Sequence, residues 1–62
     1  MKLVIEIKMD NAAFEDGNNG PEVARILRKF AVEVQDGSLM PGFDESLRDI
    51  NGNTVGNAEV FE

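Results

Sequence analysis

The one long segment with helical periodicity restricts the fold of this chain more than any other feature. It begins at Pro21, because the first turn of a helix tolerates the missing N–H of proline. It ends near Gly37, since glycine is the residue that most often closes a helix. Between them, six apolar residues recur at the spacing of one buried stripe: Val23, Ile26, Leu27, Phe30, Ala31 and Val34. We therefore predict a helix from Pro21 to Gln35, with Leu27 and Phe30 in the core.

The segment from Lys2 to Met9 alternates as a half-buried strand does. One side carries Leu3, Ile5, Ile7 and Met9, and the other carries Lys2, Val4, Glu6 and Lys8. Its β-branched residues also favour a strand. We predict that the first of these two sides faces the core.

A β-hairpin is indicated where Ser46 to Ile50 and Thr54 to Phe61 flank Asn51-Gly52-Asn53. Asn-Gly is a strong hairpin signal, because both residues accept a positive φ. A tight loop here places one set on the helix-facing side: Leu47, Gly56, Ala58 and Val60. It places another set on the opposite side: Arg48, Ile50, Val55 and Phe61. A type I turn from Asp49 to Gly52 would change this register, and the sequence leaves both turns open.

Together these elements predict a single α+β domain over residues 1–62, in the order strand, helix, strand, strand (β-α-β-β). One helix covers only one face of a three-stranded sheet. Placing the third strand between the other two makes every pairing antiparallel. The predicted strand order is therefore 1-3-2, with 3-2-1 and 2-1-3 as alternatives.

The side of the sheet that the helix leaves bare is the first candidate for an interaction surface. Four apolar residues are expected to share it: Val4, Ile50, Val55 and Phe61. Single exposed apolar side chains are ordinary, but a contiguous set marks an interface. We therefore expect a homodimer, or binding of an unidentified protein partner, through this face.

A second candidate surface lies on the helix, opposite its apolar stripe. It consists of Arg25, Arg28, Lys29 and Val32. A small basic patch on an acidic protein favours an acidic partner, whereas the simpler interpretation is a solvated face balanced by nearby glutamates. Three charges without an interleaved aromatic residue do not favour nucleic acid.

The residue types present exclude most catalytic and metal-binding chemistry. The chain has no Cys, His or Tyr, so disulfides, ordinary zinc sites and most acid–base catalysts are missing. We therefore expect no enzyme activity and no cofactor. The net charge of −6 disfavours direct binding to nucleic acid. No apolar run reaches the length of a signal-peptide core or a membrane span, which predicts a cytoplasmic protein without a membrane partner.

One segment imitates a calcium-binding loop. Asp49-Ile50-Asn51-Gly52-Asn53 carries side-chain oxygens at its first, third and fifth positions. The sixth position is Thr54 instead of Gly, and the twelfth is Val60 instead of Glu. We therefore interpret the segment as a turn capped by Asp and Asn side chains and not as a metal site.

Four stretches resemble a family of very short, uncharacterised proteins encoded by bacteria and by phages or prophages. They are Val4-Ile5-Glu6-Ile7, Asn11-Ala12-Ala13-Phe14, Glu22-Val23-Ala24-Arg25-Ile26-Leu27-Arg28 and Leu47-Arg48-Asp49-Ile50-Asn51-Gly52-Asn53-Thr54-Val55-Gly56. The resemblance implies no activity, cofactor or site residue. It favours a cytoplasmic accessory protein of a mobile element or of its host.

Two functions follow as hypotheses. The first is a protein-interaction module that acts by contact through the apolar back of its sheet. The second is an acidic decoy that imitates nucleic acid and occupies a nucleic-acid-binding protein. A decoy needs carboxylates on one face at phosphate-like spacing, and the bases on the helix interrupt that pattern.

Overall fold

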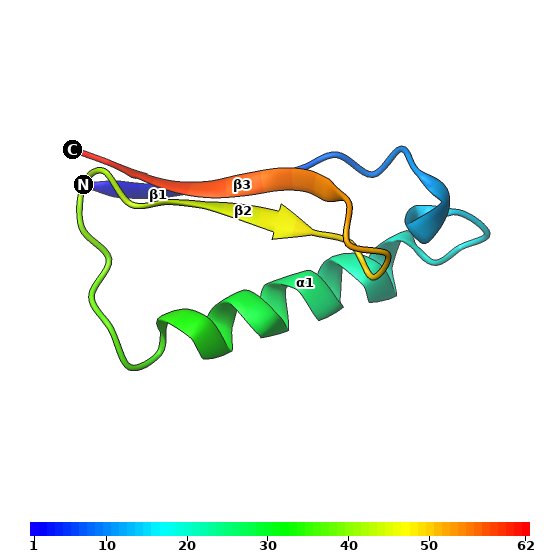
Figure 1. Ribbon diagram of the computed structural model, residues 1–62, viewed down its shortest axis with the longest axis horizontal. Coiled ribbons are helices and arrows are strands. Elements are labelled where there is room, and N and C mark those ends of the chain that lie inside the picture. The colour runs from blue at the N-terminus through cyan, green and yellow to red at the C-terminus, as the bar shows by residue number, and fades with distance from the viewer.

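The computed structural model describes residues 1–62 as two layers, a sheet and one long helix (Figure 1). The elements are strand β1 (Lys2–Ile7), a short 3₁₀ helix η1 (Ala12–Phe14), helix α1 (Asn19–Val34), strand β2 (Asp44–Arg48) and strand β3 (Thr54–Phe61). The molecule is elongated, with extents of 37 × 19 × 17 Å. The predicted α+β class and the β-α-β-β order are confirmed.

Strand β3 occupies the middle of the sheet and pairs antiparallel with a strand on each side. The order β1-β3-β2 is the predicted one. It follows from the connections. The strands that precede and follow the helix in the chain, β1 and β2, run parallel to each other, and β3 returns antiparallel between them. On β3, Val60 lies opposite Leu3 and Ala58 lies opposite Ile5. These four residues therefore share one side of the sheet.

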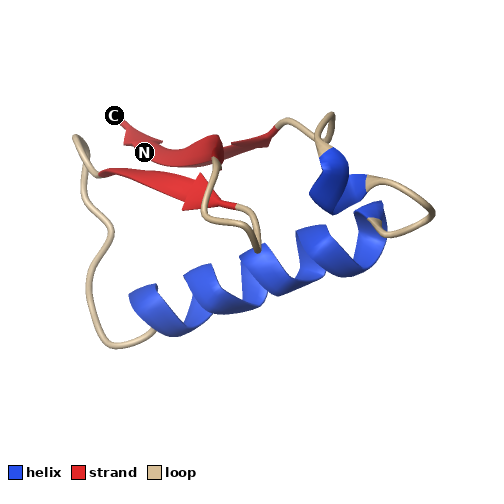
Figure 2. Cartoon of the chain, turned by 45° about the vertical axis from the view of Figure 1, so that its right-hand side comes forward, coloured by secondary structure: helices blue, strands red, loops and turns tan.

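The core lies between that side of the sheet and α1 (Figure 2). Seven buried residues form it: Ala13, Phe14, Ile26, Phe30, Leu47, Val55 and Ala58. Phe30 is buried as predicted, and its ring centroid lies 6.3 Å from that of Phe43. No helix has the length and apolar content needed to cross a lipid bilayer.

The prediction that Leu27 is buried is wrong, because its side chain is 38% exposed. The buried positions of α1 are instead Glu22, Ile26 and Phe30, which are spaced by four residues. The helix is therefore turned about its axis from the predicted orientation. Polar contacts made by Glu22 hold it in that orientation, as described below.

The hairpin between β2 and β3 contains the wider of the two turns that the sequence allows. The N–H of Gly52 donates to the carbonyl oxygen of Asp49 at 3.0 Å, and Gly52 adopts a φ of +85°. Beyond the turn, Arg48 pairs with Thr54, but Leu47 pairs with Gly56. Val55 is therefore an extra residue in β3, and the strand bulges at this point.

Candidate interaction surface

The structure separates the four residues predicted to share the bare side of the sheet. Val4 and Phe61 do lie there as diagonal neighbours on β1 and β3, and each is 42% exposed. The placement of Val55 is wrong, because the bulge turns its side chain into the buried cluster, where it is 7% exposed. The placement of Ile50 is wrong as well, since it belongs to the turn and its N–H donates to Glu22 on the helix. The contiguous apolar back face is therefore not formed.

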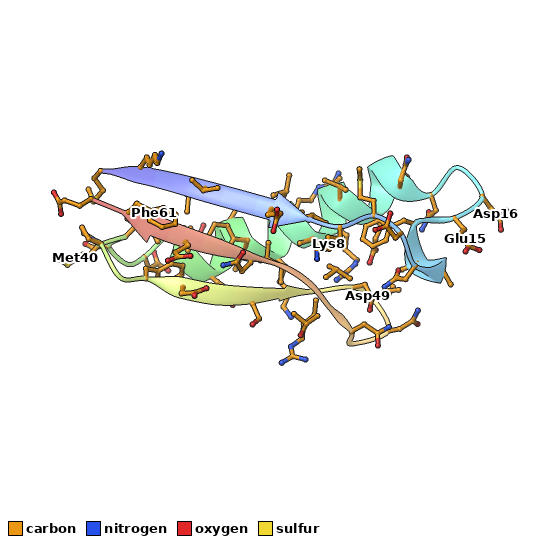
Figure 3. All side chains as sticks on the ribbon, turned by 90° about the horizontal axis from the view of Figure 1, so that it is seen from above. Lys8, Glu15, Asp16, Met40, Asp49 and Phe61 are labelled. Carbon is orange, nitrogen blue, oxygen red and sulfur yellow. The ribbon has the colours of Figure 1, made fainter.

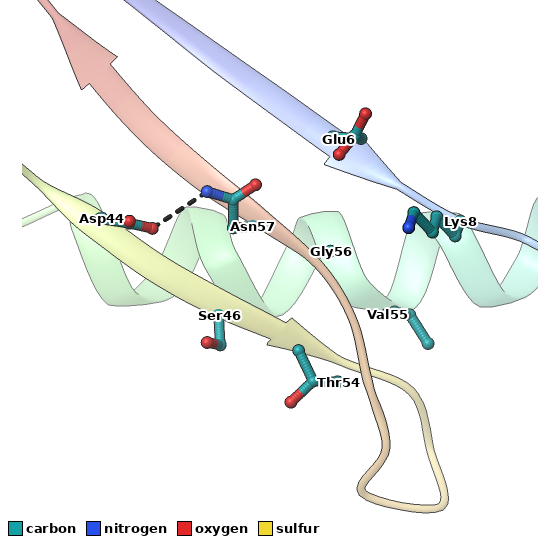
Figure 4. A pocket seen from close by; sticks show the side chains of 8 residues that line it. All are labelled: Glu6, Lys8, Asp44, Ser46, Thr54, Val55, Gly56 and Asn57. Carbon is teal, nitrogen blue, oxygen red and sulfur yellow. Dashed lines mark hydrogen bonds between the residues drawn. The ribbon is translucent and has the colours of Figure 1, made fainter.

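The rest of this side of the sheet, which we call the outer face, is polar. It contains an open hollow of about 390 Å³ beside the bulge (Figure 4). Its lining is mostly polar: Glu6, Lys8, Asp44, Ser46, Thr54 and Asn57, with Val55 and Gly56 at the bulge. The Asp44 carboxylate accepts a hydrogen bond from Asn57 Nδ2 at 3.0 Å.

The basic patch predicted on the helix loses one of its members. Arg25 Nε donates to Glu22 Oε1 at 2.9 Å, and its Nη2 donates to the carbonyl oxygen of Arg48 at 3.1 Å. Arg25 therefore joins the helix to the end of β2 and is not free to meet a partner. Arg28 and Lys29 stay exposed, as does Val32 at 64%.

Two buried carboxylates fix the helix and the hairpin to each other. Glu22 is 3% exposed, and its Oε2 accepts the N–H of Ile50 at 2.8 Å and Arg25 Nη2 at 3.1 Å. The hydrogen bond from Arg25 holds the pKa of Glu22 below its ordinary value, against the effect of burial. Burial of this residue was not predicted, although its spacing of four from Ile26 placed it next to the stripe.

The second carboxylate, Asp49, confirms the interpretation of its segment as a capped turn. Its Oδ1 accepts the N–H groups of Asn51 and Asn53, both at 2.9 Å. Its Oδ2 accepts Asn11 Nδ2 at 2.7 Å and Asn53 Nδ2 at 3.2 Å. Burial works to raise the pKa of Asp49, but the hydrogen bonds from Asn53, Asn11 and Asn51 hold it below its ordinary value. These contacts hold the loop together, and each of the two carboxylate oxygens of Asp49 accepts two hydrogen bonds.

The core is not closed along β1, on the helix-facing side of that strand. Leu3 and Ile5 are 41% and 37% exposed, although their partners across the sheet, Val60 and Ala58, are 2% and 0% exposed. Seen from above, α1 crosses under the sheet obliquely, and its C-terminal half lies toward β2 (Figure 3). Among the strands, α1 approaches β2 more closely than β1. The early part of β1 therefore has no helix beneath it.

Leu27 is a further exposed apolar residue, and it lies on the helix. On the helix, Glu22 and Arg25 face the hairpin, which lies on the β2 side. At about 100° per residue, Leu27 lies on the opposite flank of the buried stripe, toward β1. We call Leu3, Ile5 and Leu27 the open flank. The sequence did not predict this surface, because periodicity identifies the apolar sides of β1 and α1 but not how far apart they lie.

The outer margin of β1 also offers unpaired backbone groups. The N–H of Lys8 donates to the carbonyl oxygen of Val55 at 2.8 Å, which makes these two residues a hydrogen-bonded pair. Such pairs alternate along an antiparallel ladder, so the even-numbered residues of β1 bond to β3. The N–H and C=O groups of Leu3, Ile5 and Ile7 therefore point away from the sheet. A strand added there would meet both free hydrogen-bonding groups and the open flank.

Strand β2, at the other edge of the sheet, has features that protect it. It has only five residues and ends at the register shift between Leu47 and Arg48. Glu45 carries a charge on its helix-facing side, opposite Ala58. Burial raises the pKa of Glu45, and the neighbouring Glu33 adds to the rise. Short length and an inward charge are devices that keep an edge strand from pairing. Strand β1 has no bulge, proline or inward charge.

Comparison with models of known protein families, with curated proteins and with solved structures found no match for this chain.

Proposed function

We propose that this chain is a small cytoplasmic accessory protein that acts by contact with other proteins, through the open flank and the free edge of β1. One observation carries the proposal. The exposures of Leu3 and Ile5 are about two-fifths, whereas the residues directly opposite them on β3 are almost completely buried. The helix-facing side of the sheet is therefore buried along β3 but exposed along β1, where no part of the chain packs against it.

Strand addition is the mode of binding that this geometry favours. The backbone of an added strand would pair with the free groups of Leu3, Ile5 and Ile7, which supplies affinity. Its side chains on the helix-facing side would cover Leu3, Ile5 and Leu27, which supplies selectivity. Burying the exposed two-fifths of one such side chain is worth roughly 0.6–1.2 kcal/mol, if complete burial is worth about 1.5–3.

The chemistry and the resemblance of the sequence support a role by contact. A chain with no Cys, His or Tyr has few groups for nucleophilic or acid–base catalysis. The resemblance to short bacterial and phage proteins favours an accessory protein of a mobile element or of its host. Imitation of nucleic acid has less support, because Lys2 and Lys8 flank Glu6 on the outer face and break up its negative charge.

Affinity capture with single-site variants tests the proposal. The tagged chain is compared with Leu3→Lys and Leu27→Lys, which place a charge on the open flank. Val32→Lys is the matched control, because Val32 is 64% exposed on the far side of the helix. We expect both flank variants to lose bound protein that the control retains. Equal capture by all four proteins would contradict the proposal.

A further inference from the structure

We propose that the occupant of the free edge is a second copy of this chain, joined β1 to β1 about a two-fold axis at Val4. This inference rests on the proposed function and identifies the protein that binds to β1. The resulting dimer has one continuous six-stranded sheet with both helices on the same face.

The backbone restricts the possible registers. In an antiparallel pair of β1 strands, hydrogen bonds form only if the residues with free groups face one another. Those residues are Leu3, Ile5 and Ile7, so the axis must pass through a residue and not between two residues. An axis at Val4 opposes Leu3 to Ile5 in both directions. The helix-facing sides of the two copies then lie on the same side of the joined sheet, and the two open flanks face each other.

The charged residues on the outer face of β1 favour one of these registers. With the axis at Val4, Lys2 of each copy lies opposite Glu6 of the other, and Val4 lies opposite Val4. These pairs are of the non-hydrogen-bonded kind, in which side chains approach most closely. The dimer therefore contains two symmetric pairs of opposite charge, beside an apolar contact on the axis.

The neighbouring registers lack this complementarity. An axis at Ile5 opposes Lys2 to Lys8, and an axis at Glu6 opposes Glu6 to itself. Like charges directly opposite each other destabilise a strand pair. An axis at Leu3 shortens the ladder, because Glu6 then passes beyond the end of the second strand. The sequence of β1 is thus self-complementary in one register only.

The protection of β2 explains why the contact forms at β1. A chain with two free edges would extend into an open assembly, since each copy offers a second edge to the next. The short length of β2 and its inward Glu45 oppose pairing at that edge. Pairing at β1 alone closes after two copies.

Charge reversal tests the register directly, with the dimer dissociation constant measured by sedimentation and light scattering. Lys2→Glu or Glu6→Lys should each weaken the dimer about tenfold, since two attractive pairs become repulsive. The double variant with both changes should restore the affinity. Lys8→Glu is the matched control, because it makes the same change in net charge on the same side of β1 but lies outside the paired residues. It should change the affinity much less than Lys2→Glu.

The opposite results would overturn the inference. Tighter association of Lys2→Glu would indicate an axis at Ile5, and equal weakening by Lys2→Glu and Lys8→Glu would indicate general repulsion without a defined register. A chain with a mass of 6.8 kDa at all concentrations up to hundreds of micromolar would exclude the dimer. In that last case, loss of captured protein by Leu3→Lys would keep the proposed function and reject only the second copy as partner. Unchanged capture would reject both.

Discussion

Replacing Asp49 with alanine should destabilise the domain by about 2–4 kcal/mol, because the change removes the acceptor around which the hairpin loop is built. Asp49 is 4% exposed and accepts four hydrogen bonds, two from backbone N–H groups and two from side-chain amides. A hydrogen bond to a charged group contributes about 1.5–3 kcal/mol. Asn51 and Asn53 are exposed, so water can replace part of the hydrogen bonding that their N–H groups lose in the variant. The net loss is therefore less than the sum of four bonds.

The consequence is large because the domain is small. A core of this size rarely supplies more than about 3–5 kcal/mol, so the variant should be substantially unfolded without denaturant. Asp44→Ala is the matched control, since Asp44 is an exposed aspartate of β2 with a single hydrogen bond from Asn57. It should change stability by less than about 0.5 kcal/mol.

Urea denaturation followed by far-ultraviolet circular dichroism measures both effects, since the chain has no Trp or Tyr for fluorescence. All variants are compared at one protein concentration, because the proposed dimer would add to the apparent stability by an amount that rises with the concentration. The pKa of Asp49 is lower in the folded chain than in the unfolded one. The stabilisation it provides is thus present above the unfolded pKa and is lost as the pH falls through the folded pKa. A midpoint for Asp49→Ala equal to that of Asp44→Ala would refute the role assigned to this carboxylate.

Three further predictions concern the core and the helix. Ile26→Ala should lower the free energy of unfolding by about 2–5 kcal/mol and Leu27→Ala distinctly less, because only Ile26 is buried. Equal urea midpoints of the two variants would contradict this orientation of the helix. Gly56→Ala should destabilise the sheet, since its new Cβ would overlap the backbone carbonyl oxygen of Glu6. A thermal midpoint at the wild-type value would be inconsistent with that close approach. Glu22→Gln should flatten the loss of stability in acid, because the folded pKa of Glu22 is lowered and its contribution disappears as the pH falls through that value. An unchanged pH profile would argue against a stabilising ion pair between Glu22 and Arg25.

The arrangement of the elements was predictable from the sequence because each carries a strong local signal. The apolar stripe predicts the helix, and the alternation of residues predicts β1. The Asn-Gly pair predicts the hairpin of β2 and β3. The strand order then follows from the preference for antiparallel neighbours. Phe30 lies in the middle of the stripe, so any reasonable orientation of the helix buries it.

The errors lie where two local solutions have similar energies. Both turns at Asn51-Gly52 are allowed by the residues present, and the choice decides whether Val55 points to the outer face or into the core. The bulge that turns Val55 inward depends on how β3 meets β2, which no short segment encodes. Leu27 belongs to the apolar stripe and Glu22 borders it, and contacts with the hairpin bury the glutamate instead of the leucine.

The open flank illustrates the same limit for the candidate site. The sequence identifies Leu3 and Ile5 as the apolar side of a strand, and it identifies Leu27 as part of an amphipathic helix. Whether α1 covers β1 depends on its lateral position, which the Glu22 and Arg25 contacts bias toward β2. The surface therefore became visible only with the two layers in place.

Site-resolved amide hydrogen exchange across a range of protein concentrations tests the central claim most directly. In one isolated copy, the N–H groups of Val4 and Glu6 lie in the ladder with β3, whereas those of Leu3 and Ile5 face solvent. If β1 is the contact surface and a second copy occupies it, Leu3 and Ile5 should gain protection as the concentration rises, with Val4 and Glu6 protected throughout. Leu3 and Ile5 amides that exchange equally fast at every concentration, beside a protected Val4 and Glu6, would contradict the account.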